Sequence, residues 1–179
     1  MEPENKSRTR NRKHKQIEKE GSRLLFEEKL EQEGYPLENK GKPNIRPFES
    51  AVQTGRLIFV SGHAGRLNGE LINKGIVGEN ITLEQAQESA KAAFVNCLKA
   101  VKEMTGDLDR ISRIVSIRGY IASRPEFTDQ PKVMDAVTDL ANRVFGDVGR
   151  HSRAAIGVAS LPGGTSVEVE MVAEVEEEN

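Results

Sequence analysis

The sequence predicts an α+β domain in which two helices cover one face of a mixed β-sheet. Residues 82–104 and 129–145 each repeat apolar side chains at helical spacing, so each segment has one apolar stripe to bury. Residues 166–176 alternate apolar side chains with glutamates, which gives a strand one apolar and one polar face. Short apolar runs that end near glycine supply the remaining strands.

The composition fits one folded domain with a charged N-terminal segment. The chain has 179 residues, of which 36% are apolar and 30% are charged. Residues 1–24 hold eight Lys or Arg and four Glu, a net charge of +4, whereas the remainder carries −6. We therefore divide the chain into a basic tail (1–23), a short helix with a loop (24–46) and a folded domain (47–176).

The same composition disfavours several classes of protein. No apolar run reaches the length of a membrane span, and the basic N-terminus lacks the apolar segment of a secretory signal. The single cysteine, Cys97, suits a reducing compartment, and its place on a helical stripe favours a buried structural thiol over a nucleophile. Aromatic residues make up 4% and Trp is absent, so stacking surfaces for single-stranded nucleic acid are scarce. We expect a cytoplasmic protein that binds no membrane.

The N-terminal segments leave two readings open. Six of the ten residues 6–15 are Lys or Arg, which is typical of a solvated tail but also of an arm that binds RNA or another anionic surface. A short helix is expected from Leu24 to Glu33, with Leu25 and Leu30 on one side. The sequence Gly34-Tyr35-Pro36 ends it, because proline cannot continue a helix.

The first half of the domain is expected to contain a buried strand, a turn and a long helix. Residues 56–62 form the strand and Asn68-Gly69 the turn. Thr82 and Gln85 make a capping-box pattern at the start of the helix, and Gly106 ends it. The apolar stripe of this helix consists of Leu83, Ala86, Ala90, Ala93, Phe94, Cys97, Leu98, Val101 and Met104.

The second half is expected to contain a strand, a helix and two further strands. Residues 113–121 are rich in β-branched side chains and form the first of these strands. Asp129 is expected to cap the helix, with Pro131 in its first turn. The final strands are Arg153 to Leu161 and residues 166–176. Since two helices cover only one sheet face, we expect the other face to meet another subunit.

The common catalytic and cofactor motifs are missing from the sequence. No nucleophile elbow, phosphate loop or paired-cysteine motif is present, so we expect no cofactor. The histidines His14, His63 and His151 lie far apart without metal-ligand spacing, and we expect no metal site. Gly163-Gly164 favours a turn between strands over an anion-binding loop.

Two charged residues on strands are the remaining candidates. Arg153 opens an otherwise apolar strand, where a guanidinium must find an anion or reach solvent. Glu168 lies on the polar face of the last strand. If the last two strands are adjacent, these residues come close together. Spacing alone does not decide whether these two residues form a binding site. They can also be each other's ion-pair partners or ordinary solvent-facing charges.

The C-terminal pattern resembles the signature of the reactive intermediate deaminase (Rid) family, also described as endoribonuclease L-PSP-like. The signature is an Arg, seven residues, Leu-Pro, five residues and Glu-x-Glu, which matches Arg153, Leu161-Pro162 and Glu168-Val169-Glu170. Residues 47–55 and 59–62 resemble the first hairpin of the family. The resemblance covers about residues 45–176.

This resemblance implies a chorismate-mutase-like subunit, a trimeric barrel with clefts between subunits, and hydrolysis of enamines and imines to 2-keto acids and ammonia. Arg153 would bind the substrate carboxylate and Glu168 would position or activate the water. Backbone groups at Gly62 and Ala155 would line the cleft. Phe48 would contact the substrate, where well-studied members carry a tyrosine.

Two other functions stay open at this point. The protein could be a sensor that binds a 2-keto acid or related carboxylate at Arg153 without turnover. The resemblance also implies an endoribonuclease or translation inhibitor, since some family members are described in those terms. For RNA, the sequence offers only the basic N-terminal tail.

Overall fold

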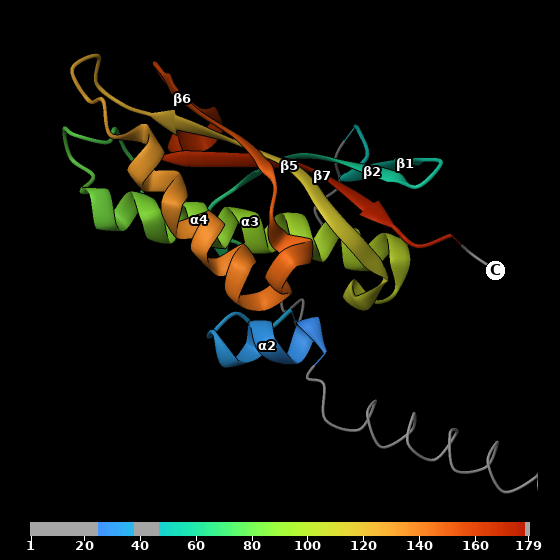
Figure 1. The fold of residues 1–179 in the computed structure, drawn as a ribbon. Coiled ribbons are helices and arrows are strands. Elements are labelled where there is room, and N and C mark those ends of the chain that lie inside the picture. Colours follow the sequence, from blue (N-terminus) through green and yellow to red (C-terminus); the bar gives the residue numbers. More distant parts are fainter. Residues whose placement is uncertain (1–24, 38–46, 178–179) are drawn as a thin grey trace, which may run out of the picture.

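The computed structural model describes residues 25–37 and 47–177. The predicted basic tail, residues 1–23, lies outside the described residues. In chain order the elements are α2 (Phe26–Gln32), β1 (Ala51–Thr54), β2 (Leu57–Ala64), β3 (Arg66–Leu67), β4 (Glu70–Leu71), α3 (Leu83–Thr105), β5 (Ile111–Ala122), α4 (Gln130–Phe145), β6 (Ser152–Val158) and β7 (Val167–Val175). The predicted α+β class is confirmed, and Figure 1 shows the sheet as one layer with α3 and α4 beneath it.

The main sheet has the strand order β1-β2-β7-β5-β6. The pair β5 and β6 is parallel, and every other neighbouring pair is antiparallel. The predicted Asn68-Gly69 turn joins β3 to β4, and both residues have the positive φ angles (51° and 86°) that such a turn requires. One expectation is wrong, because β5 lies between β6 and β7 and the last two strands are not neighbours.

Helix α3 begins and ends as the sequence predicts. The Thr82 hydroxyl accepts from the Gln85 N–H at 3.2 Å, and the Gln85 side chain accepts from the Thr82 N–H at 3.0 Å. Gly106 ends the helix with φ = 81°, a conformation that glycine adopts without steric cost. Met104 departs from the predicted apolar stripe, since it is 40% exposed. The buried stripe ends at Val101, because the last turn of the helix extends past the core.

Helix α4 also buries the apolar stripe that was predicted for it. Its buried residues are Val133, Met134, Val137, Leu140, Ala141, Val144 and Phe145. The helix starts after Asp129 with proline in its first turn, but the Asp129 side chain makes no capping hydrogen bond. Its carboxylate instead pairs with Lys132 at 3.1 Å, so the predicted cap is wrong in its contacts although right in its position.

The short helix α2 packs on the outer side of the helical layer (Figure 1). Phe26 and Leu30 are buried, and the Phe26 ring lies 4.7 Å from the ring of Phe145, measured between centroids. Leu25 was expected on the same buried side but is 50% exposed, because it precedes the first helical residue. Among the described residues, no helix combines the length and apolar character needed to cross a bilayer.

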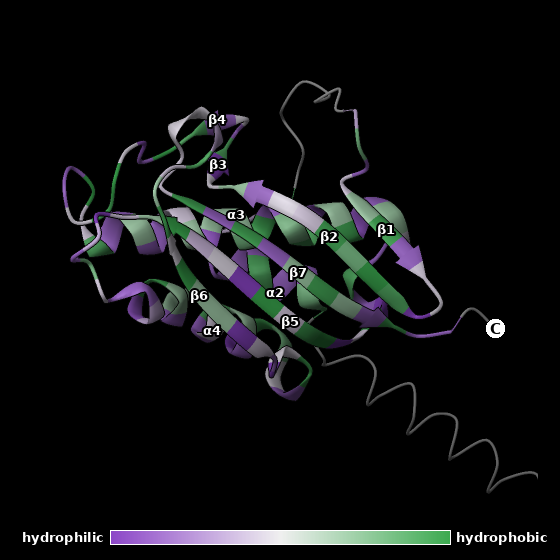
Figure 2. Ribbon diagram, turned by 90° about the horizontal axis from the view of Figure 1, so that it is seen from above, coloured by the Kyte–Doolittle hydropathy of each residue, from purple (hydrophilic) through white to green (hydrophobic). Residues whose placement is uncertain are grey.

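Strand β7 divides its side chains between the two sheet faces as its alternation predicts. Its buried members, all facing α3 and α4, are Val167, Val169, Met171, Ala173 and Val175. Its glutamates lie on the opposite side, which we call the open face and which Figure 2 views with the helices behind it. Val52, Phe59 and Ile156 add apolar side chains that are 54%, 47% and 42% exposed. The sheet therefore has one face that is covered by α3 and α4 and one face that combines charged and apolar groups.

Candidate functional site

Arg153 is held by helix α4. It pairs with Ile117 of β5, which is fully buried under the helices, so Arg153 lies on the helix-covered side of the edge strand β6. Its Nη1 donates to Asp135 Oδ1 at 2.8 Å and to Thr138 Oγ1 at 3.1 Å. The Arg153 side chain is 26% exposed, so it reaches solvent at the sheet edge while staying anchored. Asp135 and Thr138 were not predicted, because no local pattern reveals a contact between a helix and a later strand.

Behind Thr138 lies His151. Its Nε2 is 3.3 Å from Thr138 Oγ1, and its Nδ1 is 2.6 Å from the Gly149 carbonyl oxygen. Burial lowers the pKa of His151, the hydrogen bond to Gly149 opposes this effect, and the charge of Arg153 lowers the pKa further. We therefore expect a neutral imidazole near pH 7. Ala155 follows Arg153 on the same side of β6, where it is partly buried against the core.

Glu168 lies on the open face, directly above Gly62. A Cβ atom placed on Gly62 would come within 2.0 Å of Glu168 Oε1. No side chain fits there with the carboxylate in its present place, so glycine at position 62 makes the room that Glu168 occupies. Sequence analysis placed both residues in the site, and the structure brings them into contact.

The strand beside Glu168 adds a polar group that sequence analysis did not single out. Tyr120 of β5 is its cross-strand partner, so both side chains lie on the open face. Burial raises the pKa of Tyr120, and the neighbouring Glu170 raises it further through its charge and a hydrogen bond. Glu170 in turn accepts from Arg118 at 3.0 Å. Glu170 is thus paired with a cation of the neighbouring strand.

Phe48 precedes β1 and belongs to the same half of the site as Gly62. The Ser61 hydroxyl donates to the Glu49 carbonyl at 2.7 Å, and the Ser61 N–H donates to the Ser50 carbonyl at 3.0 Å. These bonds hold the segment around Phe48 along the Gly62 end of β2. The Phe48 side chain is 56% exposed.

The five predicted residues therefore form two groups within one chain. Arg153 and Ala155 lie on β6, on the helix-covered side of the sheet. Phe48, Gly62 and Glu168 lie at β2 and β7, with the Glu168 carboxylate on the open face. Strand β5 separates the groups, so the expectation that Arg153 and Glu168 come together in one chain is wrong, and Arg153 pairs with Asp135 instead.

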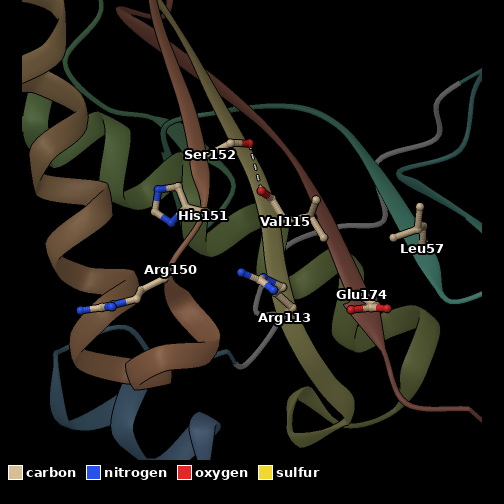
Figure 3. A pocket seen from close by; sticks show the side chains of 7 residues that line it. All are labelled: Leu57, Arg113, Val115, Arg150, His151, Ser152 and Glu174. Atoms are coloured by element: carbon tan, nitrogen blue, oxygen red, sulfur yellow. Dashed lines mark hydrogen bonds between the residues drawn. The ribbon is translucent and has the colours of Figure 1, made fainter.

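A hollow of about 610 Å³ lies on the open face (Figure 3). Its lining residues are Leu57, Arg113, Val115, Arg150, His151, Ser152 and Glu174. None of the five predicted site residues lines it. Ligand pockets are usually lined mainly by apolar side chains, whereas Leu57 and Val115 are the apolar residues here. We therefore place the candidate site at Arg153 and Glu168 rather than in this hollow.

Cys97 has a structural role, and the part of the chain that the structure describes offers no metal site. Cys97 is fully buried, its thiol donates to the Val169 carbonyl at 3.2 Å, and burial raises its pKa, so it is not a thiolate nucleophile. No cluster of three or more His, Cys, Asp or Glu that could hold a metal ion occurs among the described residues.

Comparison with known proteins agrees with this fold. The family described as Endoribonuclease L-PSP matches residues 40–175. Protein TCP17 of Trypanosoma cruzi is 36% identical over 129 residues, which are 72% of this chain and 81% of that protein. A 2-iminobutanoate/2-iminopropanoate deaminase of Dermatophagoides farinae is 29% identical over 132 residues, 74% of this chain and 88% of its own. A crystal structure of an Agrobacterium tumefaciens protein of unknown function superposes with a TM-score of 0.78 at 34% identity, covering 86% of this chain and 93% of that one.

The family match, residues 40–175, spans the sheet and both covering helices. The chain therefore belongs to the Endoribonuclease L-PSP family, the reactive intermediate deaminase family that the C-terminal signature resembles.

Proposed function

We propose that this protein hydrolyses enamine and imine intermediates of amino-acid metabolism to 2-keto acids and ammonia. The observation that carries the proposal is the positioning of two side chains, Arg153 and Glu168. The Arg153 guanidinium is held at the sheet edge, and the Glu168 carboxylate lies over Gly62. They occupy the positions that the family resemblance assigns to substrate binding and to water activation. The 2-iminobutanoate/2-iminopropanoate deaminase among its relatives supports the same substrate class.

The active cleft in this proposal lies between two subunits of a homotrimer. Within one chain Arg153 and Glu168 are separated by strand β5 and lie on opposite sides of the sheet. A second copy can supply the missing half, with Arg153 and Ala155 from one subunit facing Gly62, Glu168 and Phe48 of its neighbour. The exposed apolar side chains of the open face favour such an assembly, because burying them stabilises the contact.

The chemistry that this cleft must perform is modest. Arg153 binds the substrate carboxylate through two parallel hydrogen bonds and orients the C=N carbon. Glu168 accepts a proton from water as the water oxygen bonds to that carbon and the π electrons move to nitrogen. Glu168 returns this proton to nitrogen, which gives a carbinolamine. Glu168 then moves the hydroxyl proton of the carbinolamine to nitrogen, so the C–N bond breaks and ammonia leaves as the C=O group forms. Phe48 adds an apolar wall without a hydroxyl group.

A subunit-mixing experiment tests both the function and the shared cleft. Arg153→Ala and Glu168→Gln subunits carrying different tags are co-expressed, and trimers that carry both tags are isolated. In any mixed trimer one of the three clefts combines a native Arg153 with a native Glu168, so we expect about one third of wild-type activity. Activity is followed as the disappearance of imino acids made by an amino-acid oxidase.

The outcomes separate this proposal from its alternatives. Inactive mixed trimers, with an active wild type, would overturn the shared cleft. A wild type that binds 2-keto acids without any turnover would indicate the sensor instead. A stable monomer in light scattering at micromolar concentration would remove the cleft altogether. An RNA-binding role would depend on the basic tail, which lies outside the described residues.

A further inference from the structure

The contacts of Arg153 decide which part of its guanidinium is available to a ligand. A guanidinium has five N–H groups, two of them on Nη1. Both acceptors from α4, Asp135 Oδ1 and Thr138 Oγ1, are bound by Nη1. Among the described residues, Nε and Nη2 have no recorded protein partner. These two nitrogens form the side edge of the guanidinium, which matches a carboxylate with two parallel hydrogen bonds.

Asp135 and Thr138 lie three residues apart on α4 and are therefore neighbours on the helix surface. Two acceptors on one nitrogen restrict rotation of the guanidinium about its Cδ–Nε bond. A lysine or an unanchored arginine would have to lose this freedom on binding. The helix has already restricted it, so less conformational entropy is lost when a ligand binds.

The Thr138 hydroxyl can form hydrogen bonds to both Arg153 and His151 at once. The Gly149 carbonyl can only accept, so His151 Nδ1 carries the hydrogen in their 2.6 Å contact. In the neutral ring Nε2 is then an acceptor, and the Thr138 hydroxyl donates to it. The lone pairs of Thr138 Oγ1 remain free to accept from Arg153. The chain of bonds therefore runs in one direction, from Arg153 through Thr138 to His151.

Asp135 has a second effect that Thr138 lacks. Its carboxylate is 57% exposed and lies 2.8 Å from Arg153 Nη1, so it offsets part of the positive charge that attracts a ligand. A neutral acceptor at this position would orient Arg153 equally well and leave more of that charge available. Asp135 thus helps to orient Arg153 but weakens its attraction for an anionic ligand, whereas Thr138 only helps to orient it. Substitutions at the two positions can separate these effects.

We propose that Asp135 and Thr138 are positioning residues that turn the Nε–Nη2 edge of Arg153 toward the substrate carboxylate, and that Asp135 also lowers the affinity for anions. This inference rests on the proposed function, because it takes Arg153 as the group that binds the carboxylate. It assigns roles to two residues of α4 that need not touch the substrate.

The test is calorimetry of the full-length protein with 2-oxobutanoate, together with KM and kcat for imine hydrolysis. Thr138→Val removes an acceptor without changing shape, so the Kd should rise about 2- to 10-fold, the equivalent of one hydrogen bond, and Thr138→Ser should restore it. Asp135→Asn keeps an acceptor oxygen but removes the charge. Its Kd and KM should therefore fall several-fold with kcat nearly unchanged. A loss of structure would not tighten binding, so a fall in Kd distinguishes the proposed role of Asp135 from simple destabilisation.

Asp139→Asn is the matched control, since Asp139 is an exposed acid one turn further along α4 and makes no recorded contact with Arg153. Unchanged affinity in both Thr138→Val and Asp135→Asn, in proteins that melt like wild type, would overturn this inference alone. Absent binding by wild type, or equal binding by Arg153→Ala, would overturn the carboxylate-binding role of Arg153 and this inference with it.

Discussion

Arg153 and Glu168 are positioned in opposite ways. Arg153 is held by what surrounds it, two polar side chains on α4 with a histidine behind them. The Glu168 carboxylate lies where a side chain on Gly62 would stand, so its present place requires glycine at position 62. Because several hydrogen bonds hold Arg153, removing one of them loosens its position only in part. Changes at Glu168 should have the larger effects, because its proposed role is in the proton transfer itself.

The largest expected effect is that of Glu168→Gln. The amide keeps the shape and an acceptor oxygen but does not readily take up a proton, so kcat should fall about 100- to 10,000-fold. Binding of 2-oxobutanoate should stay nearly intact, because it depends on Arg153. Steady-state kinetics and calorimetry measure the two quantities separately.

Glu170→Gln is the control for this change, since Glu170 lies on the same face but pairs with Arg118. Its kcat should stay within a few-fold of wild type. Equal turnover by wild type and Glu168→Gln would contradict the catalytic role of Glu168 and leave Arg153 as the remaining assigned side chain.

Arg153→Lys should have an intermediate effect, although the charge is kept. An ammonium is a point charge on a flexible stem and does not present two parallel donors. With a single nitrogen it also cannot contact Asp135 and Thr138 and still present two parallel donors to a carboxylate. The expected cost in carboxylate binding is about 1.5–3 kcal/mol, measured as the change in Kd by calorimetry. A lysine variant that binds as tightly as wild type would show that the geometry of the guanidinium is unimportant.

The smallest expected effect is on the pH dependence of stability through His151. Its pKa is lowered in the folded state, chiefly by burial, so the unfolded chain binds the proton more readily. The stabilisation by the neutral ring is therefore complete above the unfolded pKa of about 6.5 and is lost as pH falls through the lower folded value. Thermal melting between pH 7 and pH 5 should show a larger loss of stability for wild type than for His151→Asn. Parallel pH curves would indicate that the ring titrates as it does in water.

Local sequence patterns predicted those parts of the structure that depend on neighbours in the chain. The Thr82 and Gln85 capping box, the glycine after α3 and the alternation of β7 each require only a few adjacent residues. The alternation of β7 placed Glu168 on the polar face, and the apolar run after Arg153 placed Arg153 at the start of a strand. The family signature then linked these two positions to Gly62, Ala155 and Phe48.

What the sequence did not reveal depends on pairing between distant segments. The insertion of β5 between β6 and β7 follows from a parallel β5–β6 pair joined through α4, and periodicity carries no information on strand order. Asp135 and Thr138 become partners of Arg153 only once α4 has packed beside β6. Both are polar residues on the outer side of an amphipathic helix, which is where solvent-exposed side chains are also found.

Gly62 also ties together two positions that lie far apart in the chain. A substitution that adds a side chain at position 62 forces the carboxylate of Glu168 to leave its place, and a shorter acid at position 168 would lift the restriction on position 62. We therefore expect these positions to covary among relatives. A relative with alanine in place of Gly62 and glutamate retained at the matching position would hold its acid elsewhere. Such a pair of residues would mark a protein with different chemistry, even where the arginine is unchanged.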